Sequence, residues 1–231
     1  MQPYLFPYLG YIQLISAVDT FVFFDDVNFI NKGWINRNNI LVNGNAHLFT
    51  LPLKKASQNK LINEIEISDY TAWKNQFLQQ IEFNYKKAPH FDPVFSWLKK
   101  TIEIKQYNLL SEFVTDTIKS IAALLELKTK FQYSSQLNYK EKPEMSGQDK
   151  VLSICKILNA THYINPKNGQ ELYNKENFDT ENIKLNFILM DDIQYTQFKN
   201  KPFVPFLSIL DVLMFSGLEN TKKLITNYHL N

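Results

Sequence analysis

The chain has 231 residues, with 25 Lys and Arg, 23 Asp and Glu, and a formal net charge of +2. Hydrophobic residues make up 45% and aromatic residues 14%, which is typical of a folded globule and excludes a disordered chain. The near-neutral charge argues against a nucleic-acid-binding protein, because such proteins carry a dominant basic stripe. No apolar run is long enough to span a membrane, so we expect a cytoplasmic protein without membrane insertion.

The first elements that the sequence predicts are a helix and a buried strand. Residues 11–18 have the apolar spacing of a helix, and residues 20–24 form a continuous apolar run typical of a parallel strand. The chain opens at Met1 already inside a motif. We therefore expect a preceding strand to be missing from this sequence.

A hairpin is predicted next, followed by a third β-like stretch. The apolar runs 40–42 and 47–51 flank Asn43-Gly44-Asn45, where Asn-Gly supplies the positive φ angles of a tight turn. Residues 61–67 have the composition of a further short strand.

From about residue 69 the apolar spacing changes to the 3.6-residue period of helices. It predicts a helical layer or insert over about residues 69–130. A polar connection at 134–146 is the best candidate for a boundary. The three helices are predicted over 70–85, 93–105 and 109–127.

The last third alternates again between helices and strands. A helix is predicted at 148–158, strands at 161–164 and 183–190, and a helix at 206–215 that ends at Gly217. The whole pattern predicts an α/β fold, with a mainly parallel sheet, strand–helix alternation at both ends and a central helical segment. We expect residues 1–231 to form a single domain.

The opening segment, residues 2–11, has two prolines and a glycine that predict a rigid loop entering a helix. Such loops lie at the carboxyl edge of α/β sheets, where ligands bind, so Gln2 and Tyr8 are candidate substrate-binding residues. A rigid, aromatic-packed turn without a ligand is an equal alternative. Tyr8-Leu9-Gly10-Tyr11 also has the spacing of the His-x-Gly-His loop of nucleotidyltransferases, but both histidines are tyrosines here, which argues against adenylyl transfer.

Asp25 and Asp26 follow the strand predicted at 20–24, where a carboxylate reaches the active edge of a sheet. Neighbouring side chains of a strand point to opposite faces, so at most one of the two is expected in a given cleft. Asp26 is the candidate catalytic residue, as a general base or an orienting group. Turn capping is the alternative, and it suits Asp25 better.

Arg37 is the only arginine, and it lies beside Trp34, Asn36 and Asn38. Its planar fork suits a phosphate or carboxylate, the indole could stack on a base or sugar, and the amides could bind hydroxyls. A structural ion pair or a chance surface position is the alternative for Arg37. Lys54 is a candidate for neutralising phosphate.

Tyr163, Asn165 and Tyr173 are candidate binding residues around the exit of the later strand, although ordinary turn chemistry also explains their segment. Ser208 and Asp211 lie on one face of an apolar helix, where capping or anchoring is the favoured role. Tyr195 and Gln197 would share one face of a short strand.

The sequence shows few residues in a spacing suited to metal binding or to nucleophilic catalysis. Four scattered histidines and Cys155 show no zinc spacing, and Cys155 lies in an apolar pattern that indicates a buried thiol. We therefore predict no metal ligands, and the cofactor is unknown.

Several separated motifs resemble those of the WbqC-like family, across essentially the whole chain. The motifs are QPYLFPYLGY at 2–11, DDV at 25–27, GWINRN at 33–38, LKKA at 53–56, YINP at 163–166, GQELY at 169–173 and LSILDVLM at 207–214.

The resemblance implies a role in bacterial O-antigen and other surface-polysaccharide biosynthesis. It also implies transfer of an amino acid, glycine, onto a sugar. Our first hypothesis is therefore an aminoacyl- or acyltransferase acting on a nucleotide-linked sugar. The alternative is a non-catalytic module that binds a sugar nucleotide or a protein partner of the pathway. A nucleotidyltransferase-like relic is a third option. Under these hypotheses we expect the protein to bind mainly a small molecule, and we expect no nucleic acid as a partner.

Overall fold

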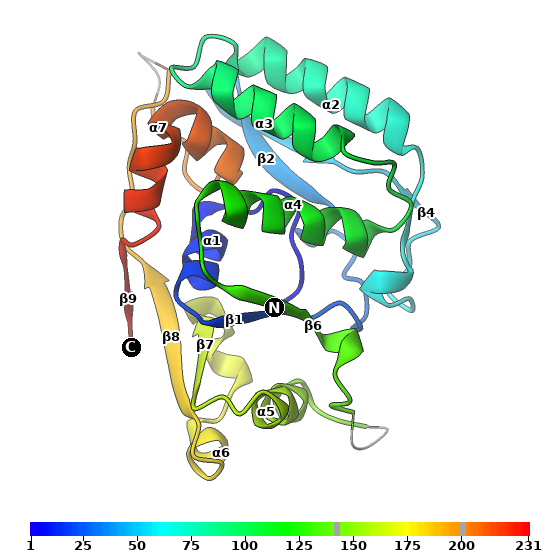
Figure 1. Cartoon of the computed structure of the whole chain (residues 1–231), viewed down its shortest axis with the longest axis vertical. Helices are drawn as coiled ribbons and strands as arrows, with labels where there is room; N and C mark the ends of the chain where they lie inside the picture. Colours follow the sequence, from blue (N-terminus) through cyan, green and yellow to red (C-terminus); the bar gives the residue numbers. More distant parts are fainter. Residues whose placement is uncertain (141–143, 199–201) are drawn as a thin grey trace.

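The computed structural model describes residues 1–140, 144–198 and 202–231 (Figure 1). Its helices and strands follow in chain order. They are α1 (Leu9–Ser16), β1 (Thr20–Phe23), β2 (Arg37–Val42), β3 (Asn45–Thr50), β4 (Leu53–Lys54), the 3₁₀ helix η1 (Ile62–Glu64), β5 (Glu66–Ile67), α2 (Tyr70–Tyr85), α3 (Phe91–Glu103), α4 (Leu110–Leu124), β6 (Lys130–Tyr133), η2 (Ser134–Gln136), α5 (Gly147–Ile157), β7 (His162–Pro166), η3 (Lys167–Leu172), α6 (Lys175–Asp179), β8 (Lys184–Met190), α7 (Ile209–Leu224) and β9 (Tyr228–Leu230).

The predicted strand at 20–24 is present as β1, and it pairs in parallel with β6. Thr20 lies opposite Lys130 and Phe23 opposite Tyr133. The rings of Phe23 and Phe131 stack at 5.3 Å between centroids, so aromatic packing reinforces the backbone ladder. Because the two strands are parallel, the segments that follow them emerge at the same edge.

The predicted hairpin is confirmed as β2 and β3, which pair antiparallel. Asn43 and Gly44 form the turn, with φ angles of 51° and 81°. Both angles lie in the left-handed region that the Asn-Gly pair tolerates. The β-like stretch at 61–67 is only partly strand, because η1 precedes the two-residue β5.

Helices α2, α3 and α4 form the predicted helical layer, which lies at one end of the molecule beside α7 and β2 (Figure 1). Trp73 and Phe77 of α2 stack at 4.9 Å, and Phe6 of the opening loop stacks on Phe77 at 5.7 Å. The helical layer therefore anchors the opening loop.

The expected mainly parallel sheet is only partly right. The described residues form four small sheets, in which β1–β6 and β7–β8 are parallel pairs. The pairs β2–β3, β4–β5 and β8–β9 are antiparallel. A tight turn such as that at Asn43-Gly44 can only join antiparallel strands, which explains the hairpin.

The predicted end of the last helix at Gly217 is confirmed. Gly217, with a φ of 72°, is non-helical, and a second helical segment follows it across a kink, so that α7 as a whole runs to Leu224. Thr221 bridges the kink by donating from Oγ1 to the Gly217 carbonyl at 2.6 Å. Within the described ranges, no helix is long and apolar enough to cross a membrane.

Buried apolar residues gather in two clusters. The larger one joins α1, β1, the hairpin, the helical layer and α7. The smaller one lies under β7 and β8 and includes Cys155 and Phe178. Cys155 is buried, as the sequence predicts, and burial raises the pKa of its thiol to about 11.

Candidate functional site

The carboxyl ends of β1 and β6 carry a cluster of polar side chains. Asp25 and Asp26 follow β1, and only 4% and 8% of their surface is exposed. Ser134, at the end of β6, donates from Oγ to Asp25 at 3.1 Å and to Asp26. Ser135 donates its backbone N–H and its Oγ to Asp25 at 3.0 and 2.7 Å. Asp25 therefore accepts hydrogen bonds from the first two residues of η2.

Both aspartates contact the Ser134 hydroxyl, although neighbouring residues of a regular strand point to opposite faces. The chain leaves the strand at Phe23, and the strict alternation of side chains ends there. Backbone pairing of Asn63 N–H with the Asp25 carbonyl at 3.0 Å holds the turned segment in place.

Asp26 is the centre of this cluster. The Tyr139 hydroxyl lies 3.0 Å from both carboxylate oxygens, and Lys140 Nζ lies 2.7 Å from Oδ2. Burial alone would raise the pKa of Asp26, but hydrogen bonds from Lys140, Ser134 and Tyr139 hold that pKa below its ordinary value. Asp26 is thus a firmly ionised carboxylate and a weak base.

Lys140 is the accessible member, with 49% of its side chain exposed. Its ammonium group also lies 3.5 Å from the Asp26 carbonyl and 5.6 Å from the Tyr139 ring centre. An ammonium group has three donors, so Lys140 can contact Asp26 and an anionic group from solvent together.

Sequence reasoning missed Ser134, Tyr139 and Lys140, because they lie in the polar connection that it treated as a boundary. The signal was the strand-like stretch Lys130–Tyr133. Had that stretch been recognised as the parallel neighbour of residues 20–24, the polar residues after it would have been expected beside Asp26.

Asn36 and Asn38, predicted to bind hydroxyls, are buried and use their amides inside the protein. Asn36 Nδ2 donates to the Leu51 carbonyl at 2.9 Å. Asn38 Nδ2 donates to the carbonyls of Leu5 and Phe6 at 3.2 and 2.7 Å. The Asn38 amide ties the opening loop to β2 beside Phe6, which has a positive φ of 41°, whereas the Asn36 amide joins the two ends of the β2–β3 hairpin.

The Arg37 side chain donates hydrogen bonds to backbone carbonyls of the loop that precedes β2. Its Nε donates to the Gly33 carbonyl at 2.9 Å, and a terminal nitrogen donates to the Lys32 carbonyl. The guanidinium carbon lies 5.9 Å from the centre of the Trp34 ring, and Trp34 is 45% exposed. Backbone carbonyls occupy part of the two-pronged donor, and Trp34, expected to stack on a base or sugar, lies beside the guanidinium group.

The remaining candidates, which come from the opening loop and from β4, contact residues other than Asp26. Gln2 is half-buried, and its carbonyl accepts from the Tyr11 hydroxyl at 2.8 Å. Tyr8 packs edge-on against Phe206 at 6.4 Å and lines a separate cavity of about 530 Å³. Lys54 forms an exposed ion pair with Glu66 at 2.8 Å.

Tyr163, Asn165 and Tyr173 do lie together at the end of β7. Asn165 Nδ2 donates to the Tyr163 hydroxyl at 2.6 Å, and the two tyrosine hydroxyls are 3.3 Å apart. A Cβ atom on Gly169 would overlap Asn165 Oδ1, so this packing requires glycine there. Both tyrosines also pack against the smaller apolar cluster, so these half-buried hydrogen bonds join the end of β7 to the segment after η3.

Ser208 and Asp211 anchor α7. Ser208 caps the helix, and its Oγ also donates to the Phe6 carbonyl at 2.8 Å. Asp211 accepts from Tyr85, Tyr195 and Gln197. The segment around Tyr195 and Gln197 is not a strand, but both side chains face Asp211, as their alternation suggests. No cluster of three His, Cys, Asp or Glu residues suited to a metal occurs in the described part of the chain.

Comparisons with known proteins place this architecture in a family. The model of the WbqC-like protein family matches residues 2–223, and the chain therefore belongs to that family. A relative in Mycobacterium tuberculosis, named "Uncharacterized protein Rv1507c", is 27% identical over 216 residues. That match covers 92% of this chain and 90% of the relative. No solved structure matches significantly.

Proposed function

We propose that this protein binds a nucleotide-linked sugar at the edge formed by Asp26, Tyr139 and Lys140, and transfers an acyl or aminoacyl group to it. The observation that carries the proposal is the half-exposed Lys140 ammonium, held 2.7 Å from the buried Asp26 carboxylate. Such a pair is an oriented cation at the carboxyl edge of parallel strands, the usual ligand position in α/β proteins.

In this proposal Lys140 contacts the diphosphate of the sugar nucleotide or the developing oxyanion of the acyl group. An amino or hydroxyl group of the sugar attacks the carbonyl carbon of an activated acyl donor. The new C–N or C–O bond forms as the leaving group departs with its electron pair, and the acceptor proton passes to that group or to water. Positioning and charge stabilisation would supply the rate increase.

The proposal adopts the biological setting that the family resemblance implies, the biosynthesis of O-antigen or other surface polysaccharides. Glycine is the aminoacyl group that the family resemblance implies. The proposal places the protein in the cytoplasm, where nucleotide sugars are made.

A binding module without turnover is the second candidate, and the state of Asp26 favours it. Its carboxylate already accepts from Ser134 and Tyr139 and pairs with Lys140, which leaves it a weak base. Such a module would present the sugar nucleotide to a protein partner of the same pathway.

The experiment compares two lysine variants that are closely matched. Lys140 is 49% exposed and pairs with Asp26 at 2.7 Å, whereas Lys156 is 50% exposed and pairs with Glu181 at 2.7 Å. Thermal shifts and calorimetry with a panel of nucleotide sugars would be measured for wild type, Lys140→Met and Lys156→Met. We expect Lys140→Met to bind about 10–100-fold more weakly, the worth of one charged hydrogen bond. Lys156→Met should bind like wild type.

Product analysis by mass spectrometry, with activated glycine and other acyl donors, separates the two candidates. A new acylated sugar nucleotide supports the transferase. Binding that Lys140→Met weakens, without any product, supports the module. If no nucleotide sugar shifts the wild type, or if both variants lose binding equally, the proposed site is wrong.

A further inference from the structure

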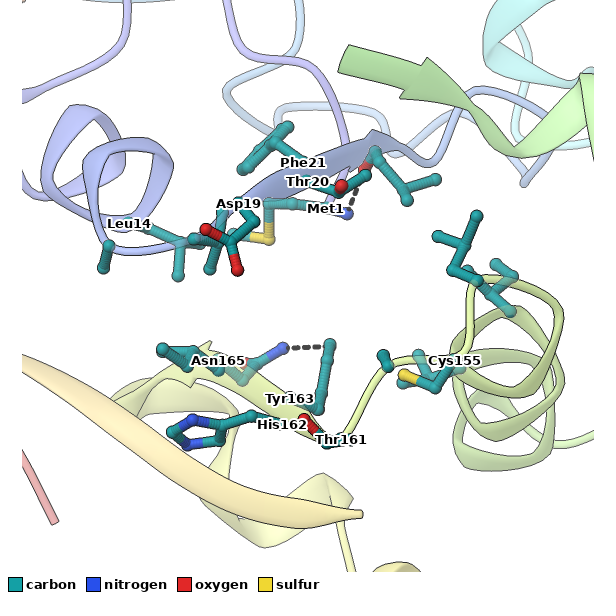
Figure 2. A pocket seen from close by; sticks show the side chains of 18 of the residues that line it. Met1, Leu14, Asp19, Thr20, Phe21, Cys155, Thr161, His162, Tyr163 and Asn165 are labelled. Carbon is teal, nitrogen blue, oxygen red and sulfur yellow. Dashed lines mark hydrogen bonds between the residues drawn. The ribbon is translucent and has the colours of Figure 1, made fainter. Parts of the chain in front are cut away.

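The cavity of about 530 Å³ beside Tyr8 lies where β8 ends and where α1 and α7 begin. Met190, the last residue of β8, forms one side, and Tyr8 and Leu207, at the starts of the two helices, form another. The cavity shares no lining residue with the one between β1 and β7 that Figure 2 shows. Its volume suits a small molecule, and it lies at the carboxyl end of the parallel pair β7–β8, where ligands of α/β proteins commonly bind.

Aromatic side chains form much of the cavity wall. Tyr8 and Phe206 pack edge-on at 6.4 Å between ring centres, and Tyr195 and Phe203 pack edge-on at 5.1 Å. The Tyr195 hydroxyl donates to Asp211 Oδ2 at 2.6 Å, so the buried network on α7 fixes this ring from behind. The rings are therefore held in place before any ligand arrives.

Phe206 is presented to solvent by a strained backbone. The residue is 67% exposed, and its φ of 57° lies in the left-handed region that bulky side chains rarely adopt. Two residues further on, Ser208 N–H donates to the Asn39 carbonyl at 2.8 Å, which holds the segment in this conformation. Strained residues that their surroundings fix in this way cluster at ligand-binding sites.

The described part of the lining has a negative charge. Asp191 and Asp192, directly after β8, both line the cavity, and none of its described lining residues is lysine, arginine or histidine. Burial raises the pKa of both Tyr8 and Tyr195, so these phenols stay neutral. Asp191 Oδ1 lies 2.9 Å from His229 Nδ1, whereas Asp192 has no hydrogen bond or ion pair with any residue that the structure describes.

The carboxylates and the aromatic wall together select one class of ligand. A neutral or anionic molecule in the cavity would take water from the two carboxylates without offsetting their charge. A protonated amine would offset it, because an ammonium group binds carboxylates and is also attracted to the faces of aromatic rings. A ring-shaped body on that amine would pack against Tyr8 and Phe206.

We propose that this cavity binds a small organic cation, a protonated amine on a ring-shaped body. Asp192 pairs with the ammonium group, and Phe206 packs against the ring. Amino sugars and aromatic amines share this chemistry, and the experiment distinguishes them. The inference does not depend on the ligand or the reaction proposed above, because the cavity contains no member of the cluster around Asp26.

The test uses two matched pairs of probes, benzylamine with benzyl alcohol and glucosamine with glucose. At about pH 6 both amines are protonated, and each differs from its partner chiefly by that charge. Binding would be followed by the methyl NMR signals of Leu207 and Val212, which line the cavity. The variants are Asp192→Asn and Phe206→Gly, and the control is Asp179→Asn, which removes an exposed carboxylate of α6 outside the cavity.

We expect at least one amine to bind at least about tenfold more tightly than its neutral partner. Asp192→Asn should remove most of that difference, whereas Asp179→Asn should bind like wild type. Phe206→Gly should weaken amine and neutral partner alike without lowering the melting temperature, because glycine adopts positive φ angles without strain.

A preference for benzylamine alone identifies an aromatic amine as the ligand class, and a preference for glucosamine alone identifies an amino sugar. A preference for both amines supports the shared chemistry. Equal affinities within both pairs, or an unchanged amine affinity in Asp192→Asn, would overturn the proposal. So would the absence of any change in the Leu207 and Val212 signals at about 10 mM amine.

Discussion

Replacement of Asp211 tests a buried hydrogen-bond network that connects several elements of the interior. The Asp211 carboxylate is fully buried in the first turn of α7. It accepts from the hydroxyls of Tyr85 and Tyr195 at 2.8 and 2.6 Å, and from Gln197 Nε2 at 2.8 Å. Tyr85 also accepts from Leu41 N–H at 2.7 Å, so one carboxylate connects α7, α2, β2 and the segment around Gln197.

Asp211→Ala leaves three buried donors without their acceptor. Each such group costs about 1–3 kcal/mol, and hydroxyl rotation recovers part of that, so we expect a loss of about 3–5 kcal/mol in unfolding free energy. Asp211→Asn keeps the size and one acceptor oxygen and should cost less. Ser216→Ala is a suitable control on the same helix, because the buried Ser216 hydroxyl has no hydrogen-bond partner within the described residues. It should change stability by less than about 1 kcal/mol.

The difference in unfolding free energy between the wild type and Asp211→Asn should also depend on pH. Burial raises the pKa of Asp211 above its ordinary 3.8, although hydrogen bonds from Tyr195, Tyr85 and Gln197 oppose the shift. A folded pKa above the unfolded one contributes stability that is fully present below pH 3.8 and is lost as the pH rises through the folded pKa. The wild type should therefore lose stability relative to Asp211→Asn as the pH rises above 4, by ~1.4 kcal/mol per unit of pKa shift.

Urea unfolding of the four proteins between pH 4 and pH 8 measures both effects. A difference between wild type and Asp211→Asn that stays constant over this range would refute the reasoning about burial. An Asp211→Ala variant as stable as Asp211→Asn would refute the hydrogen-bond network.

Three further predictions concern other parts of the chain. Gly217→Ala should destabilise by at least about 2 kcal/mol in thermal unfolding, because φ is 72° and the added Cβ would lie 2.6 Å from His90, whereas Gly147→Ala, with nothing within 4 Å, should not destabilise. Cys155 should react with iodoacetamide at pH 8 at least about 100-fold more slowly in the folded protein than in urea, and equal rates would contradict its burial. Arg37→Lys should speed amide exchange in residues 32–37 while costing less than about 1.5 kcal/mol overall, and unchanged exchange would show that the Gly33 contact is unimportant.

The sequence by itself determined the elements whose signals are local. The hairpin turn follows from Asn43-Gly44, because few other residues adopt two consecutive positive φ angles. The helices of the central layer follow from an apolar period maintained over several turns. The burial of Cys155 and the anchoring role of Ser208 follow equally from their apolar surroundings. Whether the whole chain counts as one domain stays a prediction.

Only the tertiary structure decided which residues meet. β1 pairs with β6 more than a hundred positions later, and no local pattern shows that pairing. The pairing of β1 with β6 therefore brings Lys140 to Asp26, and the spacing of motifs along the sequence does not show this contact. Arg37 and Asn38 look like ligand donors in the sequence, but both donate to backbone carbonyls. Asn38 satisfies carbonyls of the buried opening loop, which need partners, and Arg37 donates to carbonyls of the loop that precedes it. The sequence specifies the chemical groups of each side chain, whereas the hydrogen-bond partners of those groups come from segments that only folding brings together.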